Sequence, residues 1–586
     1  MYTVTECIEN PLVVVKKIFD AYKGSTNVGI GNDYEVSENF KNVFATEAAI
    51  KMIPSINDIC TDDIPSNTLV RFRCMIQNTG LGHEMYLSVF ETFDSSGVKE
   101  EGSHTNNNVN SFSSNLLDSP TTVLDERYLY YCVSVPENNS NVIKKRSNDD
   151  DSIEDLDRLA TKLNLFDDEQ HHLENHNRRQ LEKNYVASKF PFPNESHVSA
   201  IVKVYEKNDS LKVGDVMEII GVLEHFTRRE SGNNNDEFNP SNDFIDPSSL
   251  LKVPRLHAIF YRKLHSSSNP LISEVNLKNT TLEVQNTARD TRNSLIQYIA
   301  SAFAGDLLVA EFVLLQLLSR IYNRRDGLTL GKFGINITNI PPSSQIDDKS
   351  VSSSSLPLSH TNPFTRNVAA ILSSVLTKYH DLPLTLSTLN NVFFYPRCDG
   401  VLDSGVFQVS DGTFFLVDET VLKEGTLGDT GVRNMQTLTD ILNTQKLNYV
   451  FPFNNFQFNI DIGLIIFSTA KSFFPVDCVI PLRPLATQET MPSLSEETLT
   501  EYQKYISILR YLDYSISESV SEFVQNEFVK QRQTAAKNGQ SLMTPDDLFL
   551  QMNLARLTAL SFGETELTTE IWKYTLNLDR VRRERL

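Results

Sequence analysis

Two adjacent carboxylates, Asp418 and Glu419, end an apolar run that reads TFFLVDE from residue 413. Nucleotide-hydrolysing enzymes use an acidic pair at such a place, where the aspartate holds a metal ion and the glutamate activates the attacking water. The same chemistry needs a cradle of backbone N–H groups with a lysine for the phosphates, in the pattern G-x-x-x-x-G-K-[ST]. The pair therefore raises the question whether this chain hydrolyses a nucleotide.

The segment in which such a cradle belongs is residues 341–364, between the strand-like KFGINITNI and the helical TRNVAAILSSVL. It reads PPSSQIDDKSVSSSSLPLSHTNPF and contains no glycine. Its Lys349-Ser350 pair follows two aspartates, whose charge would repel a phosphate. The sequence thus predicts no P-loop, no ATPase activity and no cofactor. We interpret Asp418 and Glu419 as a strand-end pair that hydrogen-bonds a neighbouring helix or loop, with residual nucleotide or Mg²⁺ binding as the alternative.

The elements around this pair alternate between helix and strand after residue 290. A helical stretch breaks at Gly305, and Asp306 is placed to cap the helix that follows. Almost wholly apolar strands separated by helices indicate a parallel sheet covered on both faces. We expect its strands at KFGINITNI, LPLTLSTLNN, TFFLVDE, the end of DILNTQKLNYVF, and IDIGLIIFSTA. From Leu494 the pattern is helical to the end, with a break near Gly539.

The N-terminal half has a different pattern. Apolar residues three and four apart predict helices within residues 10–58. Alternating apolar and polar residues then predict strands at 69–80, 83–93 and 127–136, and two more lead to a glycine at 221. About five curled strands of this kind indicate a small closed barrel of the OB type.

Four polar tracts interrupt both halves and have too little apolar surface to offset the entropy of ordering. We expect them to be disordered insertions, at about 95–114, 137–183, 228–246 and 341–362. One of them contains KKRSNDDDSIEDLD. Its basic cluster could direct nuclear import and its serines could be phosphorylated, or the tract could be a solvated linker. The residues concerned are Lys144, Lys145, Arg146, Ser147 and Ser152.

The net charge, the cysteine spacing and the lengths of the apolar runs argue against several classes of protein. A formal charge of −21 over 586 residues does not suit a protein whose main task is to grip phosphate backbones. The six cysteines show no C-x-x-C spacing, so we expect reduced, mostly buried thiols and no metal site. No window approaches the ~20 apolar residues of a membrane span and the N-terminus lacks a signal peptide, so we expect a soluble intracellular protein.

Two further features have competing interpretations. The barrel could bind single strands, because its strands carry Phe72, Tyr86, Phe90, Tyr128, Tyr130, Tyr131 and Tyr205, but few basic residues stand beside them and core packing explains most. The C-terminal RVRRERL could contact DNA or an acidic partner, and the commoner arrangement is a solvated helix end.

The order of elements resembles an AAA+ ATPase core, and more narrowly that of a minichromosome maintenance (MCM) helicase subunit. The stretches that carry this resemblance are GDLLVAEFVLLQLLSRIY, SDGTFFLVDE, TEYQKYISILRYLDYSISESV and MTPDDLFLQMNLARLTALSFGETELTTE. Where those helicases place an arginine in the lid, this chain has Asp546. The stretch FFPVDCVIPL likewise lacks the arginine of their finger segment. The resemblance thus implies an AAA+-like core that has lost its catalytic parts.

A closer resemblance is to the MCM complex-binding protein family, in blocks that follow one another along nearly the whole chain. They include NPLVVVKKIF, VRFRCMIQN, YYCVSVPE, VKVYEKNDSLKVGDVMEIIGVL, VPRLHAIFYRKL, YNRRDGLTLGKFGINIT and FFLVDETVLKEGTLGDTGVRNMQTL. The resemblance implies an α/β plus β fold of MCM-like architecture. Its parts would be an N-terminal helical segment (1–66), an OB-like barrel (67–262), a degenerate AAA+-like core (285–490) and a C-terminal helical lid (491–586).

The family resemblance also implies a function. The chain would be a nuclear, non-catalytic partner of MCM helicase subunits, serving as a scaffold, chaperone or disassembly factor on chromatin in DNA replication, sister chromatid cohesion and the cell cycle. No sequence-specific nucleic acid, membrane or small-molecule substrate is expected. Two rival functions remain open: a weak ATP-binding regulator that uses Asp418, and a single-strand-binding OB protein.

Overall fold

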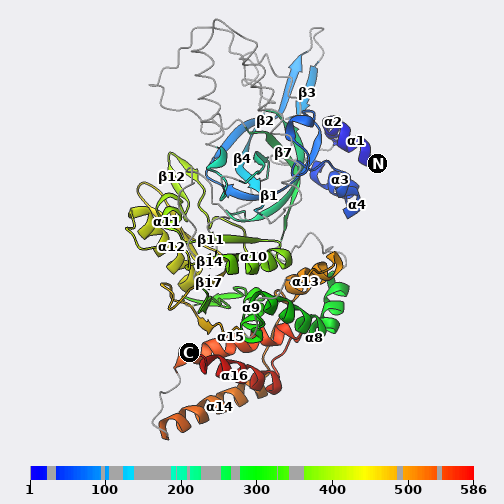
Figure 1. The fold of residues 1–586 in the computed structure, drawn as a ribbon. Helices are drawn as coiled ribbons and strands as arrows, with labels where there is room; N and C mark the ends of the chain where they lie inside the picture. Colours follow the sequence, from blue (N-terminus) through cyan, green and yellow to red (C-terminus); the bar gives the residue numbers. More distant parts are fainter. Residues whose placement is uncertain are drawn as a thin grey trace. The chain divides into compact units, whose positions relative to one another are not determined.

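The computed structural model describes residues 2–22, 35–93, 99–103, 123–136, 186–192, 195–206, 211–225, 253–264, 277–325, 327–341, 362–484, 492–537 and 544–586. These form two compact units (Figure 1). The first comprises Met1–Val135, Asn141–Leu264 and Cys398–Ser404, and the second comprises Pro136–Ser140, His265–Arg397 and Gly405–Leu586. The basic cluster and both serines of the KKRSNDDD tract lie outside the described residues.

The first unit contains a closed five-stranded barrel, as the alternating pattern predicts. The strands run in the order β1-β6-β7-β5-β4, and β4 pairs again with β1 to close the ring. All these pairs are antiparallel except β5 with β7. The barrel strands are β1 (Leu69–Asn78), β4 (Val123–Ser134), β5 (Ser199–Val204), β6 (Val216–Glu224) and β7 (Arg255–Leu264).

Period-two burial explains why β1 belongs to a barrel. Val70, Phe72, Cys74 and Ile76 point into one apolar cluster inside the ring, whereas Leu69 belongs to a second cluster outside it. The outer cluster joins the barrel to four N-terminal helices. They are α1 (Val4–Glu9), α2 (Pro11–Tyr22), α3 (Val36–Val43) and α4 (Glu47–Lys51).

A two-stranded ribbon extends the sheet from β4. β2 (His83–Phe93) has the bounds expected from its alternation, and it pairs with β3 (Lys99–Ser103). β3 lies inside the tract 95–114, which we expected to be a disordered insertion, so the expectation was wrong for residues 99–103. The backbone of β3 pairs with residues Val89–Phe93 of β2. These hydrogen bonds form between backbone groups, so they do not require apolar side chains in β3.

The second unit is built on a five-stranded sheet in the order β11-β14-β17-β10-β18. All four strand pairs are parallel, which confirms a parallel sheet. The strand expected in it at the end of DILNTQKLNYVF is wrong, because β15 (Lys446–Val450) lies in a separate four-stranded sheet, and β18 was not anticipated. Every residue of β14 and of β17 is buried, and successive side chains point to opposite faces, so both faces are covered. The strands are β10 (Ile335–Thr338), β11 (Tyr379–Pro383), β14 (Thr413–Asp418), β17 (Ile462–Phe467) and β18 (Cys478–Pro481).

Helices α8 (Leu277–Ala302), α9 (Leu307–Leu317) and α10 (Pro363–Val375) share one large apolar cluster with this sheet. Asp306 caps α9, as predicted, by accepting from the backbone N–H groups of Leu308 and Val309. No single helix among the described residues is long and apolar enough to cross a membrane. Only α8 and α9 taken together pass that test, and they are bent by 115° at their junction.

One prediction of secondary structure around β11 is wrong, and several short strands were not predicted. The stretch LPLTLSTLNN was expected to be a strand, but β11 ends at Pro383 and α11 (Leu386–Asn391) follows. Thr385 caps α11 by accepting from the N–H of Thr388 at 3.0 Å, and this local bond outweighs the strand preference of the threonines. Several elements were not anticipated: β8 (Asn323–Arg325), β9 (Leu328–Leu330), β12 (Arg397–Asp399), β13 (Val401–Asp403) and β16 (Asn455–Asn459), which forms a hairpin with β15 (Lys446–Val450).

The helical end of the chain is confirmed for the described residues. Thr544 begins α15 with a capping box in which its side chain and that of Asp547 each bind the other's backbone N–H. The C-terminal helices are α13 (Glu496–Leu509), α14 (Glu518–Lys537), α15 (Pro545–Ser561) and α16 (Thr569–Arg583). A further helix, α12 (Asp429–Thr444), lies earlier in the chain, between β14 and β15. The expectation of reduced, mostly buried thiols is also confirmed, since all six cysteines are free and four are buried.

Candidate functional site

The acidic pair lies at the carboxyl edge of the parallel sheet. Asp418 is the last residue of β14, where it stands beside Pro383 of β11 and Phe467 of β17. Ligand sites of open α/β sheets form at this edge, so the position suits a functional pair. The two side chains are nevertheless enclosed: Asp418 is 1% exposed and Glu419 is 7% exposed.

Asp418 binds its own loop. Its Oδ1 accepts from the backbone N–H of Thr420 at 2.9 Å and from the hydroxyl of Thr420 at 2.6 Å. This is the turn that aspartate commonly forms with the residue two positions on. The other oxygen, Oδ2, is buried and has no hydrogen-bond partner among the described residues. The carboxylate therefore holds the turn that leaves β14.

Glu419 binds the loop that follows β17. Its N–H donates to the carbonyl of Phe467 at 2.9 Å, and its Oε1 accepts from the hydroxyl of Ser472 at 2.5 Å. Burial raises the pKa of Glu419 to about 7, and the hydrogen bond from Ser472 opposes that shift only in part. Burial thus favours the protonated form of this side chain, which joins two loops at the sheet edge.

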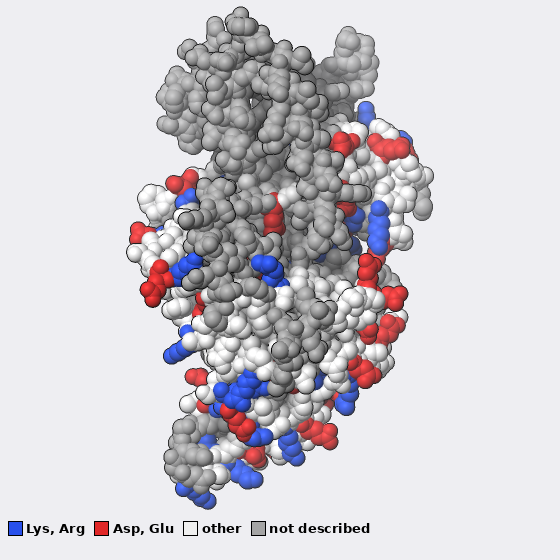
Figure 2. Space-filling model, in the orientation of Figure 1, with Lys and Arg blue, Asp and Glu red and all other residues white. Residues whose placement is uncertain are grey.

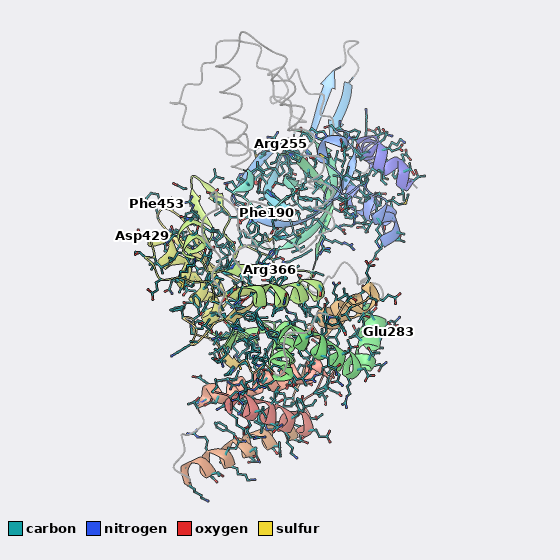
Figure 3. All side chains as sticks on the ribbon, viewed as in Figure 1. Phe190, Arg255, Glu283, Arg366, Asp429 and Phe453 are labelled. Atoms are coloured by element: carbon teal, nitrogen blue, oxygen red, sulfur yellow. The ribbon has the colours of Figure 1, made fainter. Side chains whose placement is uncertain are left out.

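The N-terminus of α10 completes this edge. Asn362 caps the helix by accepting from the N–H of Phe364 at 3.0 Å, and its amide donates to the carbonyl of Pro341 at 2.5 Å. The same amide reaches the hydroxyl of Thr420 at 3.5 Å, so α10 and the β14 turn share contacts. Arg366, labelled in Figure 3, lies on the first turns of this helix and is exposed. Residues 342–361, where a phosphate cradle would belong, lie outside the described residues.

The edge therefore consists of neutral amides and hydroxyls around two acids. Asn362, Thr420 and Ser472 supply the contacts, and sequence reasoning identified none of the three. Among the described residues, no group of three His, Cys, Asp or Glu side chains could hold a metal ion. The contacts observed here bind loops to one another and to a helix start.

Comparison with known proteins identifies the family. A family model described as mini-chromosome maintenance replisome factor matches residues 40–164 and 144–586. The chain belongs to this family. Relatives named mini-chromosome maintenance complex-binding protein are 30% identical over 626 residues in Arabidopsis thaliana and 29% identical over 656 residues in Homo sapiens. The first alignment covers 99% of both chains, and the second covers 99% of this chain and 97% of the relative.

In this member of the mini-chromosome maintenance replisome factor family, Asp546 lies on α15, whereas the acidic pair follows β14. It is exposed on the first turn of α15, and its neighbour Asp547 makes the contacts there. Asp547 accepts from Thr544 in the capping box and from Arg583 at 3.0 Å. The structure thus brings Asp418 and Glu419 together and places Asp546 in the first turn of α15.

The barrel aromatics divide into two groups. Phe72, Tyr130 and Tyr131 are buried, in agreement with core packing, and the side chain of Phe90 lies outside the described residues. Tyr86 and Tyr205 instead pack edge to face at 5.0 Å with the guanidinium of Arg127 within 6 Å of both rings. The sequence analysis expected few basic residues beside these aromatics, and the structure places two there, Arg127 of β4 and Lys203 of β5, on the same face of the sheet.

These basic side chains are already paired. Glu84 accepts from Arg127 at 2.7 Å and from Lys203 at 3.3 Å, and these two charges lower its pKa although burial opposes them. Glu224 accepts from His257 at 2.9 Å, and this bond lowers its pKa to about 2. Arg255, labelled in Figure 3, lies on β7 of the same barrel. On the face drawn in Figure 2, acidic and basic side chains are interspersed over the described surface.

Two of the C-terminal arginines, Arg582 and Arg585, form internal contacts, so the expectation of a solvated helix end was wrong for them, whereas Arg580 is exposed. Arg582 is buried and binds Asp579 at 2.6 Å and the carbonyl of Val479 at 3.1 Å. Arg585 binds Asp306, the cap of α9. The acidic partners are Asp579, one helical turn away, and Asp306, which is 279 positions away in the sequence.

Proposed function

We propose that this chain is a non-catalytic binding protein of the MCM helicase. The observation that carries the proposal is the match of nearly the whole chain to relatives named as MCM complex-binding proteins, which it covers at 97% of their length or more. Coverage of this extent argues for a shared molecular role, because nearly the full length of each relative has a counterpart here.

The proposal includes an AAA+-like core without ATPase activity. The chain order supports it: β10, α10, β11, then β14 ending on Asp418, then β17, β18 and a helical C-terminus. That is the element order on which the resemblance to MCM subunits rests. The contacts of Asp418 with Thr420 and of Glu419 with Ser472 support a structural role for the pair. The glycine-free sequence from 341 to 364 supports the lack of a phosphate cradle. The barrel's five strands support the OB type in the same way.

We further propose that binding occurs by shape at a subunit interface. Rings are built from heterologous interfaces, so a protein with the subunit shape can occupy one position without supporting motor activity. Such a role suits sequestering, assembling or dismantling MCM complexes on chromatin in the nucleus, during DNA replication and cohesion. No step of it requires a nucleotide.

One exposed feature suits a protein partner. The hairpin of β15 and β16 carries Phe453 in its turn, which is 96% exposed, and Phe456 on β16, which is 51% exposed. Phe451 packs edge to face on Phe456 at 5.5 Å, and we call these three residues the aromatic tip (Figure 3 labels Phe453). Exposed aromatic side chains of this size are typical anchors of protein interfaces.

Co-purification tests the proposal. The tagged chain should recover MCM subunits from a nuclear extract, and cross-linking mass spectrometry should then place the contact on the barrel, the sheet unit or the C-terminal helices. Recovery of no MCM subunit would refute it. Equilibrium dialysis with labelled ATP and Mg²⁺ distinguishes this proposal from a weak ATP-binding regulator. We expect no saturable binding of ATP, whereas the regulator would bind it. A single-strand-binding protein would instead show affinity that falls steeply with salt.

A further inference from the structure

Three arginines from separate elements converge behind the start of β14, at the opposite end of the strand from Asp418. Arg320 follows α9, Arg510 ends α13 and Arg556 lies within α15. Each guanidinium lies over an aromatic ring: Arg510 over Phe414 at 4.8 Å, Arg320 over Tyr511 at 5.0 Å, and Arg556 over Tyr322 at 4.3 Å. We call Arg320, Arg510 and Arg556 the arginine cluster.

The cluster has too few carboxylates for its charge. Asp461 pairs with Arg510 at 3.2 Å, and its other oxygen accepts from the backbone N–H of Ile321 at 3.2 Å. Within the part of the chain that the structure describes, no ion pair joins Arg320 or Arg556 to any acid. Arg556 is only 4% exposed, so water does not fully replace the missing partner.

Several hydrogen-bond donors in the cluster are buried without an acceptor. Among the described residues, the Nη1 of Arg556, the Nε of Arg320, the Nε of Arg510 and the hydroxyl of Tyr514 have no partner. Burial raises the pKa of Tyr514, so its hydroxyl keeps its proton. Burial lowers the pKa of Arg556 to about 10, and the neighbouring charge of Arg320 adds to that effect. Arg556 thus remains charged at neutral pH.

A buried, unpaired guanidinium is costly, because its desolvation is not repaid by a counter-charge or by hydrogen bonds. The planar fork of arginine matches the oxygens of a carboxylate or a phosphate and binds them through two parallel bonds. The cluster offers the buried guanidinium of Arg556 and the partly buried guanidinium of Arg320, neither of which forms an ion pair among the described residues, together with the hydroxyl of Tyr514. Tyr322, which is 49% exposed and lies over Arg556, marks the side from which solvent reaches the cluster.

We propose that the arginine cluster is a binding site for an oxyanion, either a phosphate or a carboxylate group, held by Arg320, Arg556 and Tyr514. The ligand oxygens would accept the donors that have no partner, and its charge would offset that of the two unpaired arginines. Arg510 would position the others through Phe414 and Asp461. The site lies in one unit and is independent of the proposed binding to MCM.

Isothermal titration calorimetry of the full chain tests this site. Inorganic phosphate and succinate are titrated separately at constant ionic strength, with chloride as the balancing anion. We expect saturable binding of at least one probe, and the tighter of the two identifies phosphate or carboxylate as the recognised group. If neither probe binds more than chloride does, the proposal is overturned.

Variants assign the binding to these residues. Arg556→Gln and Arg320→Gln should each weaken the bound probe by roughly 10-fold or more, since each removes charge-assisted hydrogen bonds. The matched control is Arg532→Gln on α14, an exposed arginine that lies over Phe528 at 5.7 Å and should leave binding unchanged. An equal loss in the control and in Arg556→Gln would contradict the assignment.

Thermal denaturation separates a ligand site from a packing role. Without added oxyanion, Arg556→Gln should melt at the same temperature as the unaltered chain or above it, because an unpaired buried charge is removed. Added phosphate or succinate should then raise the melting temperature of the unaltered chain alone. A variant that melts lower without oxyanion, and a parent chain that does not respond to either probe, would mean that Arg556 only packs on Tyr322. Calorimetry on the parent chain decides the question if the variant does not fold.

Discussion

The guanidinium of Arg585 binds both carboxylate oxygens of Asp306, at 2.6 and 3.1 Å. Asp306 is fully buried and also accepts from the N–H groups of Leu308, Val309 and Arg483. One carboxylate thereby caps α9, accepts a hydrogen bond from the backbone of Arg483 after β18, and forms an ion pair with Arg585 near the end of the chain. Arg585 thus anchors the end of the chain to the start of α9.

Removing either partner should destabilise the sheet unit. We expect Asp306→Ala to lower the free energy of unfolding by about 3–5 kcal/mol, because it removes a cap and leaves Arg585 unpaired. Arg585→Ala should cost less, about 1–3 kcal/mol, since three backbone donors still solvate Asp306. Urea denaturation measures both. Arg580→Ala, which breaks an exposed pair with Glu584, is the control and should stay within about 0.5 kcal/mol. An Arg585→Ala variant as stable as this control would argue against the contact.

Closure of the barrel depends on Gly221. A Cβ at this position would lie 2.3 Å from the carbonyl oxygen of His257 and 3.1 Å from the Cα of Ala258, and both are backbone atoms that cannot turn aside. We expect Gly221→Ala to cost about 2–3 kcal/mol by overpacking. Gly428→Ala, where the added Cβ meets only Asn390 Oδ1 at 3.7 Å, should cost less than about 1 kcal/mol in the same urea titration. Equal losses of unfolding free energy in the two variants would show that β6 and β7 can move apart to accommodate the added Cβ.

Glu419 should make stability depend on pH. Its native pKa of about 7 exceeds the ordinary value of 4.5, so between these values the folded state binds more protons than the unfolded state. The parent chain should therefore lose stability relative to Glu419→Gln as the pH rises from about 5 to about 8, by about 3 kcal/mol in total. Chemical denaturation at several pH values gives the difference. The exposed Glu424→Gln provides the control, and a Glu419→Gln difference that is constant with pH would be evidence against a buried carboxyl.

The aromatic tip should contribute to partner binding and not to folding. Phe453→Ser removes an aromatic side chain that is 96% exposed, so the melting temperature should hardly change. Binding to MCM subunits should fall by roughly 10-fold or more if the ring is an anchor. Phe549→Ser on α15, where the ring is 56% exposed, is a matched control for loss of an exposed phenylalanine. Unchanged affinity in Phe453→Ser would remove the tip from the interface.

The sheet and the barrel could be predicted because their signals are local. The uninterrupted apolar run of β14 and the alternation of β2 each specify a strand without reference to any partner. The helix α11 could not be predicted in the same way, because the threonines that suggest a strand also cap helices. The hairpin of β15 and β16 was missed since the aromatic tip lacks the glycine that marks tight turns.

The candidate site could be predicted only where its contacts are close in sequence. The D-E-T order already contains the turn from Asp418 to Thr420, whereas the partner of Glu419 is Ser472, 53 positions away. The C-terminal arginines illustrate the same limit, since Arg585 and Asp306 are 279 positions apart. Local patterns predicted the Asp306 cap correctly, but whether the charges at a helix end contact water or each other depends on tertiary contacts between distant residues.

The most direct test of a non-catalytic MCM-binding protein is calorimetric titration of the purified chain with purified MCM subunits. The titration is repeated in the presence of ATP with Mg²⁺, and with Glu419→Gln in place of the parent chain. We predict a complex whose affinity is the same in all three titrations, because Asp418 and Glu419 hold loops and no nucleotide takes part. Failure to form a complex, or an affinity that requires ATP and is lost in Glu419→Gln, would contradict this function.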